Sequence, residues 1–358
     1  MIVVTTSISG SSRDGYSQRF MRLTGSLGKK VKEFHVGDML LEHAKLIGIR
    51  MTPKNVLNTN KQALSAIRSA VFEKILSEVP DLLKDGYSIV VHIHTAFFWK
   101  HRYELAFDFH YIRRLNPDFF VNFIDDADSI VNILSVREQW HQLLFAGRDR
   151  EYTIDRILEW QSVEFEYIKG ITQLERKKLF VIPSKANENI LYRLMFEPWR
   201  KSFYLGMALT LLHGDEYADA RQRIDDMASW LNQYVIVVDP RYVEPLTPEH
   251  LAKINPSVYN QVVARDLYWL IPQCDGMVAF FPEVAFSAGV NNELREVHET
   301  SGDTMLIYPE GKAVSPFLIV WSDNTFRHEK DFREAFLRYL GEEYMHKVSC
   351  ALADALRG

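Results

Sequence analysis

The C-terminal half of the chain brings carboxylates, a hydroxyl group and a small-residue loop into one short segment, RDLYWLIPQCDGMVAFFPEVAFSAGVNNE, residues 265–293. Its apolar run MVAFF has the length and composition of a buried strand. Asp266 precedes this run, Ser287 and Gly289 follow it, and Glu293 is expected in the first turn of the next helix. Ligands of open α/β sheets bind at the carboxyl ends of strands. The segment therefore predicts a binding site of carboxylate, hydroxyl and backbone N–H groups.

The elements that must position this site alternate between apolar strands and longer helical stretches, which predicts a parallel sheet covered by helices. The expected strands are 201–207, 234–239, 276–281, 304–308 and 317–321, and the expected helices are 215–233, 262–271, 291–299 and about 329–356.

The N-terminal half shows the same alternation and ends near Trp199. Two three-layer α/β domains are therefore expected, over residues 1–198 and 199–358. The expected strands of the first are 1–6, 31–35, 88–94, 118–124 and 178–182, and its expected helices are 18–27, 61–83, 130–146 and 154–168.

Bulk composition narrows the class of protein. The 358 residues are 47% hydrophobic and carry a formal net charge of −5 without a basic block, so a nucleic-acid surface is not indicated. Two cysteines cannot form a disulfide framework. The start lacks signal-peptide features and no apolar run reaches the ~20 residues of a membrane span. We expect a cytoplasmic protein that does not enter a membrane.

Three pieces of the second domain, in order, resemble the nucleoside 2-deoxyribosyltransferases and the related nucleoside 5′-monophosphate N-glycosidases. The first is the strand motif YLGM, with Tyr204 and Gly206. The second is RDL, with Asp266, shortly before Asp275. The third is SAGVNNE, which matches the family pattern S-x-G-x-x-x-E and ends at Glu293. The resemblance covers most of residues 201–325 and implies a flavodoxin-like, Rossmann-type sheet.

The resemblance also implies roles for these side chains. Cleavage of an N-glycosidic bond builds positive charge on the anomeric carbon, and a carboxylate beneath that carbon can stabilise it or attack it. Glu293 takes this role by resemblance, and a first-turn position would favour its ionised form. Asp266 would orient the sugar or move a proton to or from the base, and the Tyr204 hydroxyl would place Glu293 or the sugar.

Ser287 distinguishes two branches of the family. The transferases of free nucleosides tend to carry an acidic residue here, which binds the 5′-hydroxyl, whereas the monophosphate hydrolases carry serine. A serine hydroxyl and the N–H groups near Gly289 can hold a phosphate that a carboxylate would repel. With Gly206 as a further substrate-binding position, the expected ligand is a nucleoside 5′-monophosphate and the expected acceptor is water.

Each of these residues also has an ordinary structural interpretation. Glu293 could be a carboxylate that compensates a helix dipole on the surface, and Asp266 could be a charge on a helix surface. Ser287 could cap a turn, and Tyr204 could belong to the core. Asp275 is expected to shape the turn into its strand.

The first domain opens with a strand, a small-residue loop and a helix, which is the layout of a P-loop. Together with the segments FHVGDML, HIHT, LNPD and GRDRE, it is similar to archaeal-type adenylate kinases over about residues 1–195. A working P-loop needs a lysine for the phosphates, and the only cation here is an arginine, which is not equivalent. Phosphoryl transfer with Mg-ATP is therefore in doubt. The alternatives are a retained phosphate site and a scaffold without ligand. The candidate nucleotide-binding residues are Ser9, Gly10, Ser11, Ser12 and Arg13.

Four histidines lie in one stretch of the first domain and raise the question of a metal. His92 and His94 alternate on an expected strand and would share a face, with His101 and His110 further on. Because no neighbouring cysteine or carboxylate set completes a site in this stretch, core or loop histidines are expected and no metal.

The sequence thus predicts a nucleotide N-glycosidase with a glutamate nucleophile and no cofactor for that step. The kinase-like domain would bind a nucleotide, regulate or support assembly, and the resemblance implies at least a homodimer. The alternatives are a nucleotide sensor without turnover, a nucleoside 2-deoxyribosyltransferase, an NAD glycohydrolase and a nucleotide kinase.

Overall fold

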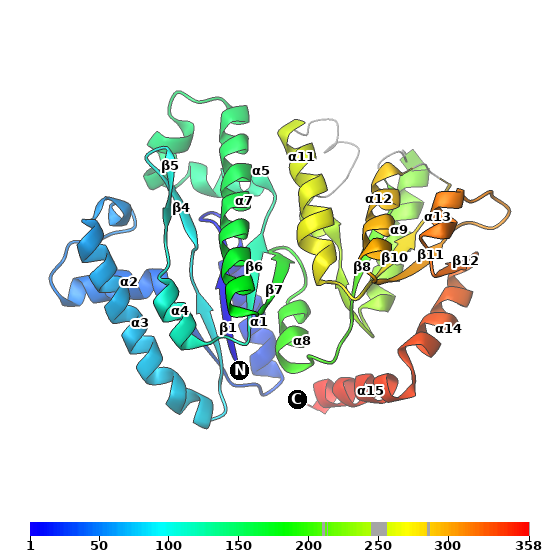
Figure 1. Cartoon of the computed structure of the whole chain (residues 1–358), viewed down its shortest axis with the longest axis horizontal. Coiled ribbons are helices and arrows are strands. Elements are labelled where there is room, and N and C mark those ends of the chain that lie inside the picture. Colours follow the sequence, from blue (N-terminus) through cyan, green and yellow to red (C-terminus); the bar gives the residue numbers. More distant parts are fainter. Residues whose placement is uncertain (210–211, 213, 245–255, 285–286, 358) are drawn as a thin grey trace. The chain divides into compact units, whose positions relative to one another are not determined.

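The computed structural model describes residues 1–209, 212, 214–244, 256–284 and 287–357. Its contacts divide the chain into two compact units, Met1–Glu188 (unit 1) and Asn189–Gly358 (unit 2), each with its own sheet (Figure 1). The boundary predicted at 198/199 lies just after α8 (Asn189–Phe196), which contacts strand β9 of unit 2.

Unit 1 is built on a five-stranded parallel sheet in the order β2-β3-β1-β6-β7, with helices packed against it and a separate antiparallel hairpin, β4–β5. Strand β6 is buried throughout, as expected of a parallel strand covered on both faces. Its strands are β1 (Ile2–Thr6), β2 (Val31–His35), β3 (Ser88–His92), β4 (Ala96–Trp99), β5 (Arg102–Leu105), β6 (Phe119–Ile124) and β7 (Lys178–Pro183). Its helices are α1 (Arg13–Ser26), α2 (Val36–Leu46), η1 (Val56–Asn58), α3 (Lys61–Lys84), α4 (Phe109–Leu115), α5 (Ala127–Ser135), α6 (Glu138–Trp140), η2 (His141–Phe145) and α7 (Arg150–Glu175).

Unit 2 is built on a second five-stranded parallel sheet, in the order β12-β11-β10-β8-β9. Counted along the unit, this is the 2-1-3-4-5 order of flavodoxin-like folds, whose topological switch point lies between the first and third strands, here β8 and β10. Its strands are β8 (Ser202–Met207), β9 (Ile236–Val238), β10 (Gly276–Phe280), β11 (Asp303–Ile307) and β12 (Asn324–Phe326). Its helices besides α8 are α9 (Gly214–Leu231), η3 (Pro240–Tyr242), α11 (Pro256–Arg265), η4 (Asp266–Leu270), η5 (Ile271–Gln273), α12 (Ala288–Glu299), α13 (Pro316–Val320), α14 (Glu329–Leu340) and α15 (Glu342–Arg357).

Alternation along β8 separates the core of unit 2 from its candidate site. Phe203 and Leu205 join a buried cluster that includes Ile224 of α9 and Phe336 of α14. Because successive side chains of a strand point to opposite faces, Tyr204 and Gly206 face the other layer, which α12 covers. One strand therefore anchors the core with one set of residues and presents the other to the site.

The predicted fold class, two α/β units each around a parallel sheet, is confirmed. The predicted strand at 317–321 is wrong: Pro316 begins helix α13, because proline is pre-organised for the first helical position. The β4–β5 hairpin was not predicted. Within the described residues, no helix combines the length and apolarity needed to cross a membrane.

Candidate active site

A cavity of about 420 Å³ lies at the carboxyl end of the unit 2 sheet. It is bounded by the end of β8, by α11 and η4, and by the first turns of α12, which is where the switch-point rule places ligands. Its polar lining residues are Glu244, Arg265, Asp266, Ser287, Asn292 and Glu293, and its apolar ones include Met207, Val262, Val263 and Leu267.

Tyr204 and Glu293, 89 positions apart in the sequence, are hydrogen-bonded beside this cavity. The fully buried Tyr204 hydroxyl donates to Glu293 Oε1 at 3.0 Å. Burial, with the neighbouring acidic charges, raises the pKa of Tyr204 well above its usual value, so the phenol keeps its proton and acts as a donor. Tyr204 therefore holds the Glu293 carboxyl in place.

Glu293 is not in the first turn of its helix, and this part of the prediction is wrong. Helix α12 begins at Ala288 with Ser287 as its N-cap, so Glu293 lies in the second turn, where the dipole effect has faded. Burial, and then the charge of Asp266, raise the pKa of Glu293 to about 8, and the Tyr204 hydrogen bond only partly opposes them. The carboxyl thus tends to hold its proton near neutral pH, opposite to the expected direction.

Asp266 opens η4, a π-helical turn, and lines the same cavity. Burial raises its pKa, against the charge of Arg265, whose Nε lies 3.3 Å from Asp266 Oδ1. Arg265 also pairs with the buried Glu244, at 3.6 Å between Nη1 and Oε1. Three carboxyls and one guanidinium therefore surround one cavity. Glu244 was not predicted as a site residue, and its only signal in the sequence is its place shortly after β9.

Gly206 gives the Glu293 carboxyl the room it occupies. A Cβ at this position would lie 2.1 Å from Met277 Cε and 3.1 Å from Glu293 Oε2. In the structure Gly206 is thus a close-approach position beneath Glu293, whereas the sequence analysis expected it to bind substrate. That expectation stays a prediction.

Ser287 and Gly289 form the helix end that faces the cavity. Ser287 Oγ accepts from the Val290 N–H at 3.2 Å, so it caps α12, as the alternative interpretation stated. Its own hydroxyl proton is not used in this bond. The first N–H groups of a helix have no partner inside the helix, and here they adjoin a cavity that could receive an anion.

Asp275, another carboxylate of the segment, has a structural position. Its Oδ2 accepts from the Ser202 N–H at 2.7 Å and from Ser202 Oγ at 3.1 Å. These bonds join the amino ends of β8 and β10, at the opposite end of the strands from the cavity.

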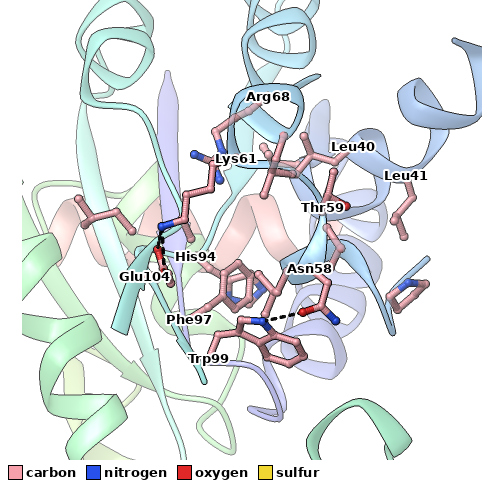
Figure 2. A pocket seen from close by; sticks show the side chains of 18 of the residues that line it. Leu40, Leu41, Asn58, Thr59, Lys61, Arg68, His94, Phe97, Trp99 and Glu104 are labelled. Carbon is pink, nitrogen blue, oxygen red and sulfur yellow. Dashed lines mark hydrogen bonds and ion pairs between the residues drawn. The ribbon is translucent and has the colours of Figure 1, made fainter. Parts of the chain in front are cut away.

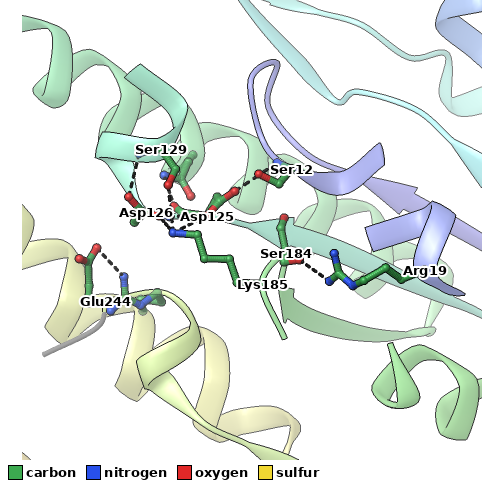
Figure 3. Close-up of polar contacts among 10 residues, drawn as sticks. Ser12, Arg19, Asp125, Asp126, Ser129, Ser184, Lys185 and Glu244 are labelled. Carbon is green, nitrogen blue, oxygen red and sulfur yellow. Dashed lines mark hydrogen bonds and ion pairs between the residues drawn. The ribbon is translucent and has the colours of Figure 1, made fainter. Parts of the chain in front are cut away.

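In unit 1, the P-loop-like segment is engaged by the protein itself. The Ser12 N–H donates to Asp125 Oδ2 at 3.1 Å (Figure 3). Arg13 is buried and donates to the Ile93 carbonyl at 2.7 Å. A Cβ on Gly10, which has φ +88, would lie 2.7 Å from the Leu134 side chain. Phosphate binding by Ser9, Gly10, Ser11, Ser12 and Arg13 stays a prediction, and these contacts favour the scaffold alternative.

Next to this loop, two carboxylates and a lysine form a compact cluster (Figure 3). Lys185, after β7, pairs with Asp126 and donates to Ser129 Oγ at 2.9 Å, while its Nζ lies 3.8 Å from Asp125 Oδ1. Asp125, which accepts the Ser12 N–H, is thus held beside the Lys185 ammonium group. This charge stabilises the contact in which the protein's own carboxylate binds the loop.

A larger cavity of about 610 Å³ lies elsewhere in unit 1. Its walls include Leu40, Phe97 and Trp99, whose indole N–H donates to Asn58 Oδ1 at 3.2 Å (Figure 2). Arg68 also lines it, and the buried Nε of Arg68 has no hydrogen-bond partner among the described residues. Aromatic walls with an arginine suit a planar anion.

Comparison with known proteins adds little at the level of sequence. No family model matches the chain, and no curated protein matches it. Among solved structures, a thymidylate kinase from Candida albicans is similar at 16% identity with a TM-score of 0.34, covering 55% of this chain and 92% of the other. At these values the likeness supports no conclusion about this chain.

Proposed function

We propose that unit 2 cleaves the N-glycosidic bond of a nucleoside 5′-monophosphate, with Glu293 as the group that meets the anomeric carbon. The observation that supports this most is the Tyr204–Glu293 hydrogen bond beside a cavity that Asp266 also lines, at the switch point of the sheet. The ordered sequence motifs name the same three residues.

The proposed reaction has two steps. The ionised Glu293 attacks the anomeric carbon, the bond from that carbon to the base nitrogen breaks, and the base leaves with a proton. Water then attacks the glycosyl ester, which releases the sugar phosphate and restores the carboxylate. A second nucleoside base in place of water would give transfer, and nicotinamide as the leaving base would give NAD cleavage.

The protonation of Glu293 and Asp266 suits a reaction that needs one carboxylate and one proton donor. Burial and the charge of Asp266 raise the pKa of Glu293, and burial raises the pKa of Asp266 against the charge of Arg265. Two such carboxyls can hold one proton between them near neutral pH. The ionised member attacks or stabilises the sugar cation, and the protonated one can supply the proton that the leaving base needs.

The helix end supports a phosphate on the substrate. Ser287, whose Oγ only accepts in its bond with the Val290 N–H, and the N–H groups of the first turn of α12 offer hydrogen bonds to an anion. The apolar residues Val262, Val263 and Leu267 line the rest of the cavity and suit the face of a base.

The test is a base-release screen of the full chain against a panel of nucleoside monophosphates, with free base detected by chromatography. We expect release by the wild type and a loss on the order of 10³-fold or more in Glu293→Gln, as a lost nucleophile costs. Glu296→Gln, on the same helix but outside the cavity lining, should be unaffected. The proposal is refuted if the wild type releases base from none of the nucleotides, or if Glu293→Gln and Glu296→Gln release base at equal rates.

A second variant tests the phosphate separately from the chemistry. Ser287→Asp keeps a good N-cap but places a carboxylate beside the 5′ position. We expect base release from the monophosphate to fall. The rate for the corresponding free nucleoside, divided by the rate for the monophosphate, should therefore rise. An unchanged ratio of the two rates would show that the helix end does not bind the 5′ group, while leaving Glu293 in its role.

A nucleotide-binding protein without turnover is the second candidate, and the 610 Å³ cavity of unit 1 favours it. This function predicts that the protein binds nucleotides measurably and releases no base from them. The Arg68→Met substitution should weaken the binding. Kinase activity is the weaker alternative, because the P-loop-like segment already bonds to Asp125 and to the Ile93 carbonyl. An assay with labelled ATP and monophosphate acceptors would detect such activity as diphosphate. A homodimer, to be tested by sedimentation, also remains a proposal.

A further inference from the structure

A row of polar side chains crosses three parallel strands of unit 1 at their carboxyl ends. In the sheet register, Thr5 of β1 is opposite His92 of β3, and His92 is opposite His35 of β2. Glu33 precedes His35 by two positions, so it projects from the same face of β2. The register therefore brings two imidazoles and a carboxylate together from two neighbouring strands.

The ligand atoms of these residues are close enough to share one ion. His92 Nε2 lies 3.1 Å from Glu33 Oε1, and His35 Nε2 lies 3.7 Å from Glu33 Oε2. The three ligand atoms lie within 4.8 Å of one another. Tetrahedral zinc, with bonds of about 2.0–2.1 Å, separates its ligand atoms by about 3.3 Å, so small side-chain rotations would complete the geometry.

We propose that Glu33, His35 and His92 form a binding site for a divalent transition metal ion, with zinc as the best match. Two imidazoles and one carboxylate are a donor set that zinc accepts with a fourth position left for water or another ligand. No metal was expected from the sequence, because the stretch around His92 holds no further set of cysteine or carboxylate donors. The other two ligands come from β2, where Glu33 lies 59 positions before His92.

Outer contacts hold the proposed ligands in position. His92 Nδ1 is hydrogen-bonded to Thr5 Oγ1 at 2.7 Å, which fixes the ring so that Nε2 faces Glu33. Ser17 of α1 donates to the Glu33 carboxylate. Metal-binding histidines almost always have such a partner on the second ring nitrogen.

The ion would join β2, at the edge of the sheet, to β3. An edge strand held by only one neighbour gains most from such a link, and a ligand that binds only the folded state raises its stability. We therefore expect zinc to raise the unfolding temperature of unit 1.

The experiment is a zinc titration of the full, tag-free chain after chelator treatment, followed by a chromophoric competitor. We expect one equivalent to bind, with affinity at least tenfold weaker in Glu33→Gln and in His35→Ala, whose half-exposed side chain can be removed without emptying the core. Thr5→Val should weaken binding by about 10- to 100-fold, as outer-shell partners do.

His110→Ala is the matched control, because His110 is an exposed histidine of the same unit outside the set. Its affinity for zinc should equal that of the wild type. The proposal is overturned if the full chain binds no stoichiometric zinc, if His35→Ala and Glu33→Gln bind as the wild type does, or if His110→Ala loses binding equally. Base release by unit 2 is independent of each outcome.

Discussion

Glu293 and Asp266 are two acidic groups that the fold has withdrawn from water, and the charge of Asp266 adds to the effect of burial on Glu293. An exposed carboxylate at neutral pH would be ionised and fully solvated. Here the ionised form is costly in the free protein, and a substrate on which positive charge develops would favour it. In the proposed reaction, this arrangement would stabilise the transition state more than the ground state.

Tyr204→Phe tests that arrangement through its pH dependence. The hydrogen bond from Tyr204 lowers the pKa of Glu293, so its loss raises that pKa further above about 8. If ionised Glu293 attacks, base release rises with pH through this value, and the rise moves to higher pH in the variant. For each unit by which the pKa of Glu293 rises, the rate of base release at pH 7 falls about tenfold. A rate–pH profile checks this, and an unmoved limb would separate Tyr204 from Glu293 in function.

The two glycines of the site make a matched pair of substitutions. Gly206→Ala forces a Cβ to within 2.1 Å of Met277 Cε, and overpacking of this kind costs roughly 1–3 kcal/mol. Gly289→Ala meets only Ser287 Oγ at 3.8 Å and should stabilise the helix by up to about 1 kcal/mol. Urea unfolding measures both, and equal effects would contradict the close-approach role of Gly206.

At the scale of elements, the two ends of the unit 2 strands differ in what they contact. Asp275 and Ser202 connect the amino ends of β8 and β10, while the carboxyl ends of the same sheet border the cavity. The bonds that join the strands and the candidate site therefore lie at opposite ends of the same sheet.

Asp275→Ala should therefore destabilise the protein without changing the site. Loss of the acceptor leaves the Ser202 N–H unpaired, whereas the Ser202 hydroxyl keeps its hydrogen bond to the Gln273 carbonyl, at a cost of about 1.5–3 kcal/mol in the free energy of unfolding. Denaturant unfolding would show this loss, and kcat/KM for base release per folded molecule should stay within about twofold. A collapse of kcat/KM in folded protein would mean that Asp275 also affects the site.

At the scale of the whole molecule, the described residues include a large hydrophobic core drawn entirely from unit 1 and another drawn entirely from unit 2. Unit 1 also contains the buried Glu164, which accepts the backbone N–H groups of Thr95 and Ala96. Burial outweighs these bonds and raises the pKa of Glu164 to about 7.

This raised pKa gives unit 1 a pH dependence of its own. The folded state binds the proton of Glu164 more tightly than the unfolded state, so its contribution to stability is complete below about pH 4.5 and is lost as pH rises through about 7. The loss is at most about 3 kcal/mol. Hydrogen exchange should show it in β1 and β3 but not in β8 and β10, and Glu164→Gln should flatten it. A slope that persists in this variant would assign it to another group.

The sequence by itself determined the alternation of strands and helices, and hence two parallel α/β units, because hydrophobic periodicity is a local property. The resemblance of three ordered motifs to a known family also singled out Tyr204, Asp266, Ser287 and Glu293. The sequence did not show the turn of α12 in which Glu293 lies, because the helix start depends on the Ser287 cap. It assigned 317–321 to a strand, because an apolar run does not show that Pro316 will begin a helix.

Only the tertiary structure decided which of these groups meet. Glu244 joins the cavity of Asp266 because β9 lies beside β8, and Glu33 meets His92 because β2 lies beside β3. The direction of the Glu293 pKa also came from the fold, since burial and a neighbouring carboxyl outweigh any effect of its place along a helix. Register and desolvation depend on contacts between distant segments, and no local pattern in the chain encodes them.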